Sequence, residues 1–217
     1  MAISTLSTPV IAIARSGEVE YEKALEIQRH IHGEVSRGER TNTLLLLEHP
    51  SIYTAGKRTL ESEKPTNGAR VIDVDRGGKI TWHGPGQLVG YPIIKLANPQ
   101  ELVGFVRALE GALINVCADF GIATTRITDR SGVWLDDERG QRKIAAIGIR
   151  VAQGVSMHGF ALNVNPDLSA FNAIVPCGIS DASVTSLEME LSRTITTNDV
   201  LPSIEKHIYE ALIQVAE

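Results

Sequence analysis

The chain has 217 residues, of which 43% are hydrophobic and 22% charged, and its formal net charge is −5. These values suit one soluble domain over residues 1–217 with a sizeable core, and we expect residues 1–8 to be peripheral or disordered. No apolar run approaches the ~20 residues that span a bilayer, and no secretion signal is evident, so we predict a cytoplasmic protein without a membrane partner. The negative charge gives no support to nucleic acid as a partner, and two cysteines without CxxC spacing argue against disulfides and zinc.

The first predicted helix covers residues 18–35, where apolar side chains recur at helical spacing. Residues 43–48 form a short apolar run that ends at His49-Pro50, which predicts a buried strand. Residues 60–70 are rich in Glu, Lys, Pro, Asn and Gly and show no periodicity. We therefore expect a mobile loop there.

A second helix is predicted over residues 99–120. Asn98 is a good N-cap, Pro99 would occupy the first helical position, and Glu101 would complete a capping box. The apolar stripe of this helix includes Cys117, and a thiol on such a face behaves as a small hydrophobic group. We predict that Cys117 is a core residue.

Four strand-like runs follow, joined by turns at 136–141 and 153–154: they cover 123–127, 133–135, 144–151 and 155–164. Helical patterns return over 183–191 and 198–215. Hairpins mixed with separate helices predict an α+β fold rather than a doubly wound α/β fold.

The segment from Arg76 to Pro92 is the most informative, because five glycines and two prolines surround an arginine, a tryptophan and a histidine. Apolar runs at 71–74 and 88–94 flank it and predict two strands. Glycine at this density serves a backbone that takes unusual dihedral angles or lets a ligand approach closely. We predict a strand, a shaped loop that forms the floor of a pocket, and a second strand; a structural hairpin is the alternative.

Basic residues gather in two parts of the sequence despite the net negative charge. If each group shares a face, an acidic partner could dock there, whereas scattered solvated side chains are the alternative. The groups are Lys57, Arg58, Lys64, Arg70, Arg76 and Lys79, and Arg139, Arg142, Lys143 and Arg150.

Cys177 differs from Cys117 because it stands between a proline and a glycine, ahead of the predicted helix at 183–191. A helix N-terminus would favour the thiolate, and its N–H groups could stabilise an oxyanion. A buried structural cysteine is the alternative. A nucleophile would need a partner, for which the chain offers a lysine or three histidines: His49, His83 and His158.

Lys143 starts a run of small and apolar residues, where partial desolvation would suit its amine to general acid–base chemistry; an ordinary hairpin lysine is the alternative. Small residues at 145–148 and 159–161 leave room for a narrow apolar ligand such as an acyl chain, or for tight packing. Phosphate-binding GxxxxGK[ST] and GxGxxG loops, a GxSxG elbow and an HExxH motif are all absent from the sequence.

Four motifs in this order resemble the lipoyl(octanoyl) transferases of lipoate biosynthesis, and the resemblance covers nearly the whole chain. It implies the fold of the biotin/lipoate protein ligases, with mixed, mostly antiparallel sheets flanked by helices. The motifs are Arg76-Gly77-Gly78-x-x-Thr81-Trp82-His83-x-x-Gly86-Gln87, Lys143 to Gly148, His158 to Asn163, and Pro176-Cys177-Gly178-Ile179.

The resemblance implies an octanoyltransferase that uses neither ATP nor a metal. Cys177 would take the octanoyl group from octanoyl-acyl carrier protein as a thioester. It would then pass the group to a lysine of apo lipoyl domains, in E2 subunits of 2-oxoacid dehydrogenases or in the glycine cleavage H protein. Lys143 would favour the thiolate and shuttle protons.

The resemblance also implies which residues line the acyl site, with His49 as a possible supporting residue near the sulfur. These residues are Arg76, Gly77, Gly78, Lys79, Ile80, Thr81, Trp82, His83, Ala146, Ile147, Gly148, Gly159, Phe160 and Ala161.

Two other functions remain open for such a chain. One is an ATP-dependent lipoate or biotin ligase of the same fold, which would activate the acid as an adenylate and need no thiol nucleophile. The other is a non-catalytic acyl-binding module. Cys177 favours the transferase over both.

Overall fold

The computed structural model describes residues 10–174 and 182–217. A large sheet forms its centre, in which the β1–β2 and β9–β11 pairs are parallel and the other pairs antiparallel. Across this sheet the strands follow the order β1 (Ile11–Glu18), β2 (Asn42–Glu48), β6 (Gln87–Ile93), β10 (Val155–Asn163), β9 (Gly140–Ala152), β8 (Arg130–Asp137) and β7 (Thr125–Ile127), and β11 (Ser183–Val184) pairs with β9.

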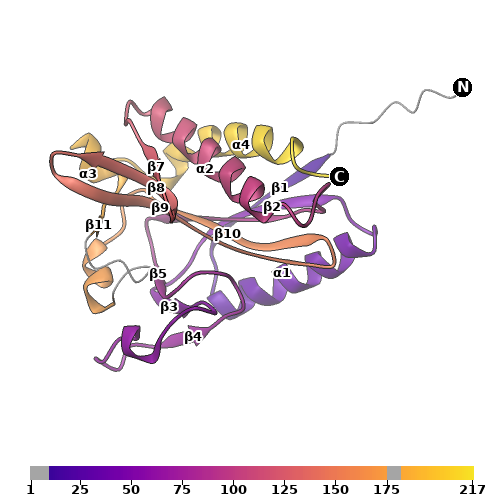
Figure 1. Cartoon of the computed structure of the whole chain (residues 1–217), viewed down its shortest axis with the longest axis horizontal. Coiled ribbons are helices and arrows are strands. Elements are labelled where there is room, and N and C mark those ends of the chain that lie inside the picture. The colour runs from indigo at the N-terminus through magenta and orange to yellow at the C-terminus, as the bar shows by residue number, and fades with distance from the viewer. Residues whose placement is uncertain (1–9, 175–181) are drawn as a thin grey trace, which may run out of the picture.

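A second, three-stranded sheet lies beside the large one, on the side of α1 (Figure 1). Its strands are β4 (Val71–Asp73), β3 (Ile52–Ala55) and β5 (Thr81–His83), and short 3-10 helices occupy Glu61–Glu63 and Leu168–Ala173. The sequence predicted a continuous loop where β5 lies. The three residues of β5 become a strand only because they pair with β3, at Ile52↔His83 and Thr54↔Thr81.

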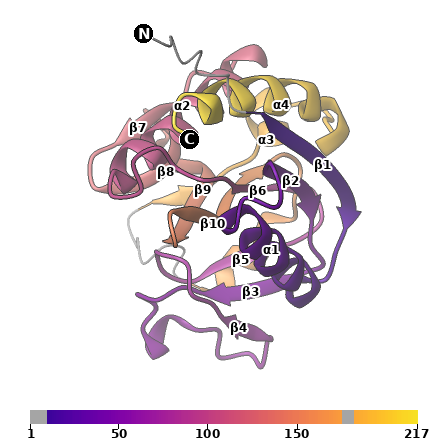
Figure 2. The same cartoon turned by 90° about the vertical axis from the view of Figure 1, so that its right-hand side faces the viewer.

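Helices cover both faces of the large sheet (Figure 2). The helix α1 (Tyr21–Ser36) packs on one face, while α2 (Leu102–Asp119) and α4 (Thr197–Ile213) pack on the other. Successive leucines of β2 therefore point into different cores: Leu44 and Leu46 lie in the α2–α4 core, and Leu45 and Leu47 in the α1 core. This explains why β2 is apolar without alternation.

The predicted α+β class and most predicted helices and strands are confirmed. The predicted start of the second helix was wrong, because α2 begins at Leu102 with Glu101 as its N-cap. The Asn98 side chain instead accepts a hydrogen bond from the backbone N–H of Gln100, and the Asn98 carbonyl accepts from the N–H of Glu101. These bonds make a turn ahead of the helix.

The predicted helix over 183–191 was wrong in its first half. Ser183 and Val184 form β11, Ser186 is the N-cap, and α3 covers only Leu187–Leu191. No helix therefore starts at 183, and the argument that a helix N-terminus lies directly after Cys177 loses its basis. Residues 1–8 and Cys177 lie outside the described residues.

None of the helices in the described part of the chain has the length and apolar character needed to cross a membrane.

Candidate active site

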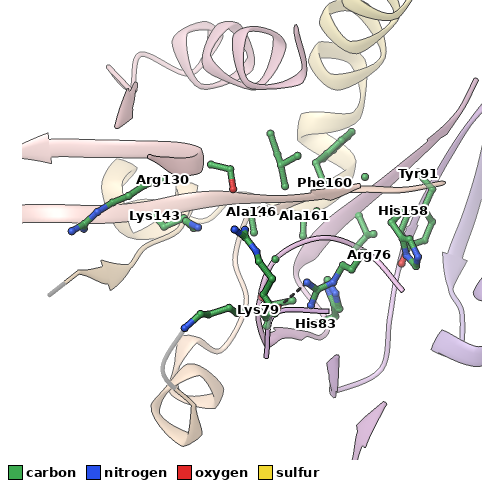
Figure 3. A pocket seen from close by; sticks show the side chains of 18 of the residues that line it. Arg76, Lys79, His83, Tyr91, Arg130, Lys143, Ala146, His158, Phe160 and Ala161 are labelled. Atoms are coloured by element: carbon green, nitrogen blue, oxygen red, sulfur yellow. Dashed lines mark hydrogen bonds between the residues drawn. The ribbon is translucent and has the colours of Figure 1, made fainter. Parts of the chain in front are cut away.

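A cavity of about 390 Å³ lies between the two sheets (Figure 3). One wall consists of β6, β9 and β10 of the large sheet. The other comes from β5 and the loop before it, and Tyr21 of α1 and the β7–β8 turn complete the lining. Segments far apart in the sequence therefore meet around one space.

Most residues of the predicted acyl site line this cavity. Gly77, Ile80, Trp82 and His49 do not: Ile80 and Trp82 pack with Tyr53 and Phe171 in a separate small core. The predicted site residues among its lining are Arg76, Gly78, Lys79, Thr81, His83, Lys143, Ala146, Ile147, Gly148, Gly159, Phe160 and Ala161.

Two glycines of the lining are closely packed against neighbouring segments. A Cβ on Gly159 would lie 2.1 Å from the carbonyl oxygen of Gly90, on the neighbouring strand. A Cβ on Gly148 would lie 3.0 Å from Cδ of Arg76 and 3.1 Å from the Gly77 oxygen. Both glycines let the backbone approach closely, which also keeps the floor of the cavity free of large side chains.

Arg76 holds the loop that forms one wall. Its Nη2 donates to the carbonyl oxygen of Thr54 at 2.7 Å and to the Thr54 hydroxyl at 2.9 Å. Its Nη1 donates to the Lys79 carbonyl at 2.8 Å, drawn as a dashed line in Figure 3, and to the Gly77 carbonyl at 3.0 Å. The buried guanidinium thus ties the loop to β3, in addition to the loop's own backbone bonds to Lys57, Arg58 and Ile149.

Lys143 is buried on β9, and its Nζ lies 4.6 Å from the ring centroid of Trp134, a cation–π distance. In the sheet, Lys143 is paired with Trp134 on one side and Val184 on the other. The N–H of Thr185 also donates to the Lys143 carbonyl at 2.9 Å. The chain that follows the segment of Cys177 is thus anchored at Lys143.

His49 and His83 form an aromatic cluster with Tyr21 and Tyr91. The ring centroids of His49 and His83 are 5.7 Å apart, and Tyr21 stacks on His83 at 5.9 Å. His49 Nδ1 donates to the carbonyl of Val19 at 2.6 Å, so its Nε2 accepts from the Tyr91 hydroxyl at 2.7 Å. Burial lowers the pKa of His49 to about 4 and that of His83 to about 3, so both rings are neutral at pH 7.

The family model for the lipoyl protein ligase A/B catalytic domain matches residues 20–209. The octanoyltransferase of Salinispora tropica is 58% identical over 206 residues, which cover 94% of this chain and 97% of that protein. The octanoyltransferase of Leifsonia xyli subsp. xyli is also 58% identical, over 86% of this chain and 84% of that protein.

The chain belongs to the octanoyltransferases of this family. It is therefore an acyltransferase, as the motifs predicted.

Solved structures show that the octanoyltransferase shares the ligase fold. Lipoate-protein ligase A bound with ATP superposes with a TM-score of 0.73 at 15% identity, over 95% of this chain and 86% of that one. The apo biotin protein ligase of Aquifex aeolicus gives a TM-score of 0.53 at 13% identity, over 95% and 70%. The predicted biotin/lipoate ligase fold is confirmed.

Sequence reasoning missed part of the lining of this octanoyltransferase cavity. Tyr21 falls on the apolar face of a helix and Tyr91 in an apolar strand, so neither gave a signal beyond that of a core residue. His158, which the sequence offered as a candidate partner of Cys177 and as the first residue of the third motif, lines the cavity with a positive φ of 57°. Its Nε2 donates to Asp75 at 2.7 Å, and Asp75 also pairs with Arg150.

Ion pairs offset much of the charge of the two basic groups of the sequence. Many of their members pair with carboxylates: Lys64 with Glu61 and Asp73, Arg70 with Glu22, Lys79 with Glu63, Arg139 and Arg142 with Asp137 and Glu190, and Arg150 with Asp75. Arg58 and Lys79 nevertheless line the cavity, together with Arg130 at the start of β8. Within the described residues, no three His, Cys, Asp or Glu side chains are grouped to hold a metal ion.

Proposed function

We propose that this octanoyltransferase moves an octanoyl group from octanoyl-acyl carrier protein to a lysine of apo lipoyl domains, through a thioester on Cys177. The observation that carries the proposal is the 58% identity to an octanoyltransferase over nearly the full length of both chains. The cavity supports it, because small residues of β9 and β10 leave an apolar trough that contains the buried Lys143.

In the first step, the Cys177 thiolate attacks the thioester carbonyl of the donor. The new carbon–sulfur bond forms as the bond to the carrier's thiol breaks, and the leaving thiolate takes up the proton that Cys177 has lost. One thioester replaces another, so the exchange has little thermodynamic cost. The ammonium of Lys143 would favour the thiolate by its charge and carry the proton between the two sulfurs.

In the second step, the lysine amine of the lipoyl domain attacks the acyl-enzyme. A carbon–nitrogen bond forms, the bond to Cys177 breaks, and the proton lost by the amine returns to the Cys177 sulfur through Lys143. The product is an amide, which is more stable than a thioester, so this step drives the whole transfer forward. Neither step consumes ATP or needs a metal.

The charges around the cavity agree with an acidic donor. Arg58, Lys79, Arg130 and Lys143 bring positive charge to the lining, whereas Asp129 is its only carboxylate among the described residues. An acyl carrier protein is acidic, so these side chains would attract it despite the net charge of −5. The acceptors we propose are the lipoyl domains of 2-oxoacid dehydrogenase E2 subunits and the glycine cleavage H protein.

The competing function is ATP-dependent ligation, because a lipoate-protein ligase of the same fold binds ATP. A fold shared at 15% identity does not decide between the two chemistries. The high-identity relatives and Cys177 favour the transferase. An acyl-binding module without activity is the third candidate and would not need Cys177.

A transfer assay separates these functions. The purified protein is mixed with an apo E2 lipoyl domain and either octanoyl-acyl carrier protein without ATP, or free octanoate with ATP and Mg²⁺. We expect the lipoyl domain to gain one octanoyl group, detected by intact mass, only with the carrier-bound donor. Modification only with octanoate and ATP would establish a ligase, and no modification in either mixture would favour the binding module.

A further inference from the structure

A buried line of side chains connects His83 on β5 with the end of β11. Nδ1 of His83 lies 2.7 Å from Oε1 of Gln87, and Nε2 of Gln87 lies 2.9 Å from Oδ1 of Asn163. Nδ2 of Asn163 lies 2.9 Å from the carbonyl oxygen of Thr185. These four residues are exposed by 7%, 2%, 5% and 0%, so solvent does not interrupt the line.

The carbonyl at the end of this line fixes the direction of every hydrogen bond. The Thr185 oxygen can only accept, so the NH₂ group of Asn163 faces it and the Asn163 oxygen faces Gln87. Gln87 must then donate its own NH₂ to Asn163 and turn its oxygen toward His83. His83 therefore carries its hydrogen on Nδ1, and Nε2 is left as an acceptor.

The surroundings keep the His83 ring neutral. Burial lowers its pKa to about 3, and the nearby His49, Arg76 and His158 lower it too, while the bond to Gln87 raises it. Tyr21 covers one face of the ring, and His49 approaches it edge-on. A ring that stays neutral is too weak a base to take a proton outright, but it can accept a hydrogen bond from a group in the cavity that His83 lines.

We propose that Gln87 and Asn163 are positioning residues that hold His83 in one tautomer, so that its Nε2 accepts an N–H of the incoming lysine amine during the second transfer. An attacking thiolate has no hydrogen to donate, so this acceptor has no role in forming the acyl-enzyme. An amine keeps an N–H while its lone pair attacks, and an acceptor for that N–H restricts the direction of the lone pair. This inference rests on the proposed function.

The same line also links His83 to Lys143. Asn163 bonds to the carbonyl of Thr185, and the N–H of Thr185 bonds to the carbonyl of Lys143. The His83 ring and the backbone of Lys143 on β9 therefore belong to one hydrogen-bonded unit that passes through Gln87, Asn163 and Thr185.

The test measures the two half-reactions separately in Gln87→Leu and Asn163→Leu. We expect discharge of the octanoyl-enzyme by the lipoyl domain to slow by about 10- to 100-fold, as for a buried group that has lost its partner. Acyl-enzyme formation and the KM for the lipoyl domain should stay near the wild-type values. Ring ¹⁵N shifts should show His83 protonated at Nδ1 in the wild type and a tautomer mixture in Gln87→Leu.

Two further variants distinguish positioning from a general loss of structure. In Gln87→Glu, a carboxylate would face His83 and raise its pKa. The acid limb in the pH profile of the discharge rate should therefore move up by about one pH unit or more. Asn42 is another buried amide, which accepts from the N–H of Lys95 at 2.8 Å and does not line the cavity. Asn42→Ala should cost stability without changing discharge.

The proposal is overturned if His83 keeps its wild-type tautomer in Gln87→Leu, if discharge slows no more than in Asn42→Ala, or if the acid limb stays in place in Gln87→Glu. Failure of the proposed function looks different, because the wild type would then form no octanoyl-enzyme. In that case the ¹⁵N shifts still decide whether Gln87 sets the His83 tautomer.

Discussion

Arg76 belongs to the motif that predicted an acyl site, yet its guanidinium holds the loop together. It donates to the backbone carbonyls of Thr54, Gly77 and Lys79 and to the Thr54 hydroxyl. A motif residue can therefore matter to a site by shaping it. Sequence alone could not separate this role from direct contact with substrate, because the bonds to Thr54 depend on how β3 packs against the loop.

We predict that Arg76→Lys destabilises the fold. A lysine cannot reproduce the planar fork, so several carbonyls lose charge-assisted hydrogen bonds, and the free energy of unfolding should fall by about 2–3 kcal/mol. Urea denaturation measures this, with Arg58→Lys as an exposed control from the same cavity lining. Unchanged stability combined with lost activity in Arg76→Lys would show that Arg76 acts on the substrate instead.

The neutral histidines predict how stability depends on pH. Burial lowers the folded-state pKa of His49 to about 4 and of His83 to about 3, from an ordinary value of 6.5. Below pH 6.5 the unfolded chain binds more protons than the folded one, so the free energy of unfolding falls as the pH is lowered from 6.5 toward 4. Each histidine contributes a slope of up to about 1.4 kcal/mol per pH unit.

Urea denaturation between pH 4.5 and 7.5 checks this pH dependence. In His83→Leu, the free energy of unfolding should change less steeply with pH than in the wild type over the same range. A wild-type stability that stays flat, or an identical slope in the variant, would contradict the assignment of a buried neutral His83.

At the scale of elements, local patterns predicted the strands with long apolar runs, including β2, β6, β9 and β10. The β9–β10 hairpin follows from its alternation and from Gln153-Gly154, both of which have positive φ, 53° and 77°. The sequence did not predict β1, β3, β5 or β11; β5 and β11 have three residues or fewer, and each is stabilised by pairing with another segment, β3 or β9. The start of α2 was missed because Asn98 forms a turn in place of a cap.

The Gly159→Ala variant tests whether this glycine is needed for packing of the sheet or for clearance around the ligand. In Gly159→Ala, the Cβ would lie 2.1 Å from the Gly90 oxygen and 2.5 Å from Cδ of Pro92, so β6 and β10 must separate. We expect a loss of more than about 2 kcal/mol in the free energy of unfolding, measured in urea. Gly17→Ala is the control, because a Cβ at Gly17 on β1 meets no atom within 4 Å. Wild-type stability in Gly159→Ala with weaker acyl transfer would assign the glycine to ligand clearance.

At the scale of the whole molecule, the cavity results from packing one sheet against the other. The motifs predicted much of its lining, because Lys143, Ala146 and Gly159 lie in runs of small residues that are unusual in sequence. The tyrosines could not be predicted as part of the site. Tyr21 contacts His49 and His83 because α1 packs on the face of the large sheet opposite α2 and α4. No local sequence pattern describes that contact.

A lipoate-protein ligase with this fold binds ATP, so the proposed acyl-enzyme on Cys177 is the claim that distinguishes this account from ligation. Cys117 provides a matched control within the chain. It is fully buried in the core, and burial raises the pKa of its thiol to about 12, so it stays protonated and unreactive. Cys117→Ala should lower the free energy of unfolding by only about 1 kcal/mol and leave transfer intact.

The most direct measurement is the intact mass of the protein after mixing with octanoyl-acyl carrier protein in the absence of ATP. We predict one octanoyl adduct on the wild type and on Cys117→Ala, none on Cys177→Ala, and loss of the adduct when an apo lipoyl domain is added. An adduct that persists in Cys177→Ala, or a lipoyl domain that becomes octanoylated at the wild-type rate by that variant, would contradict the account.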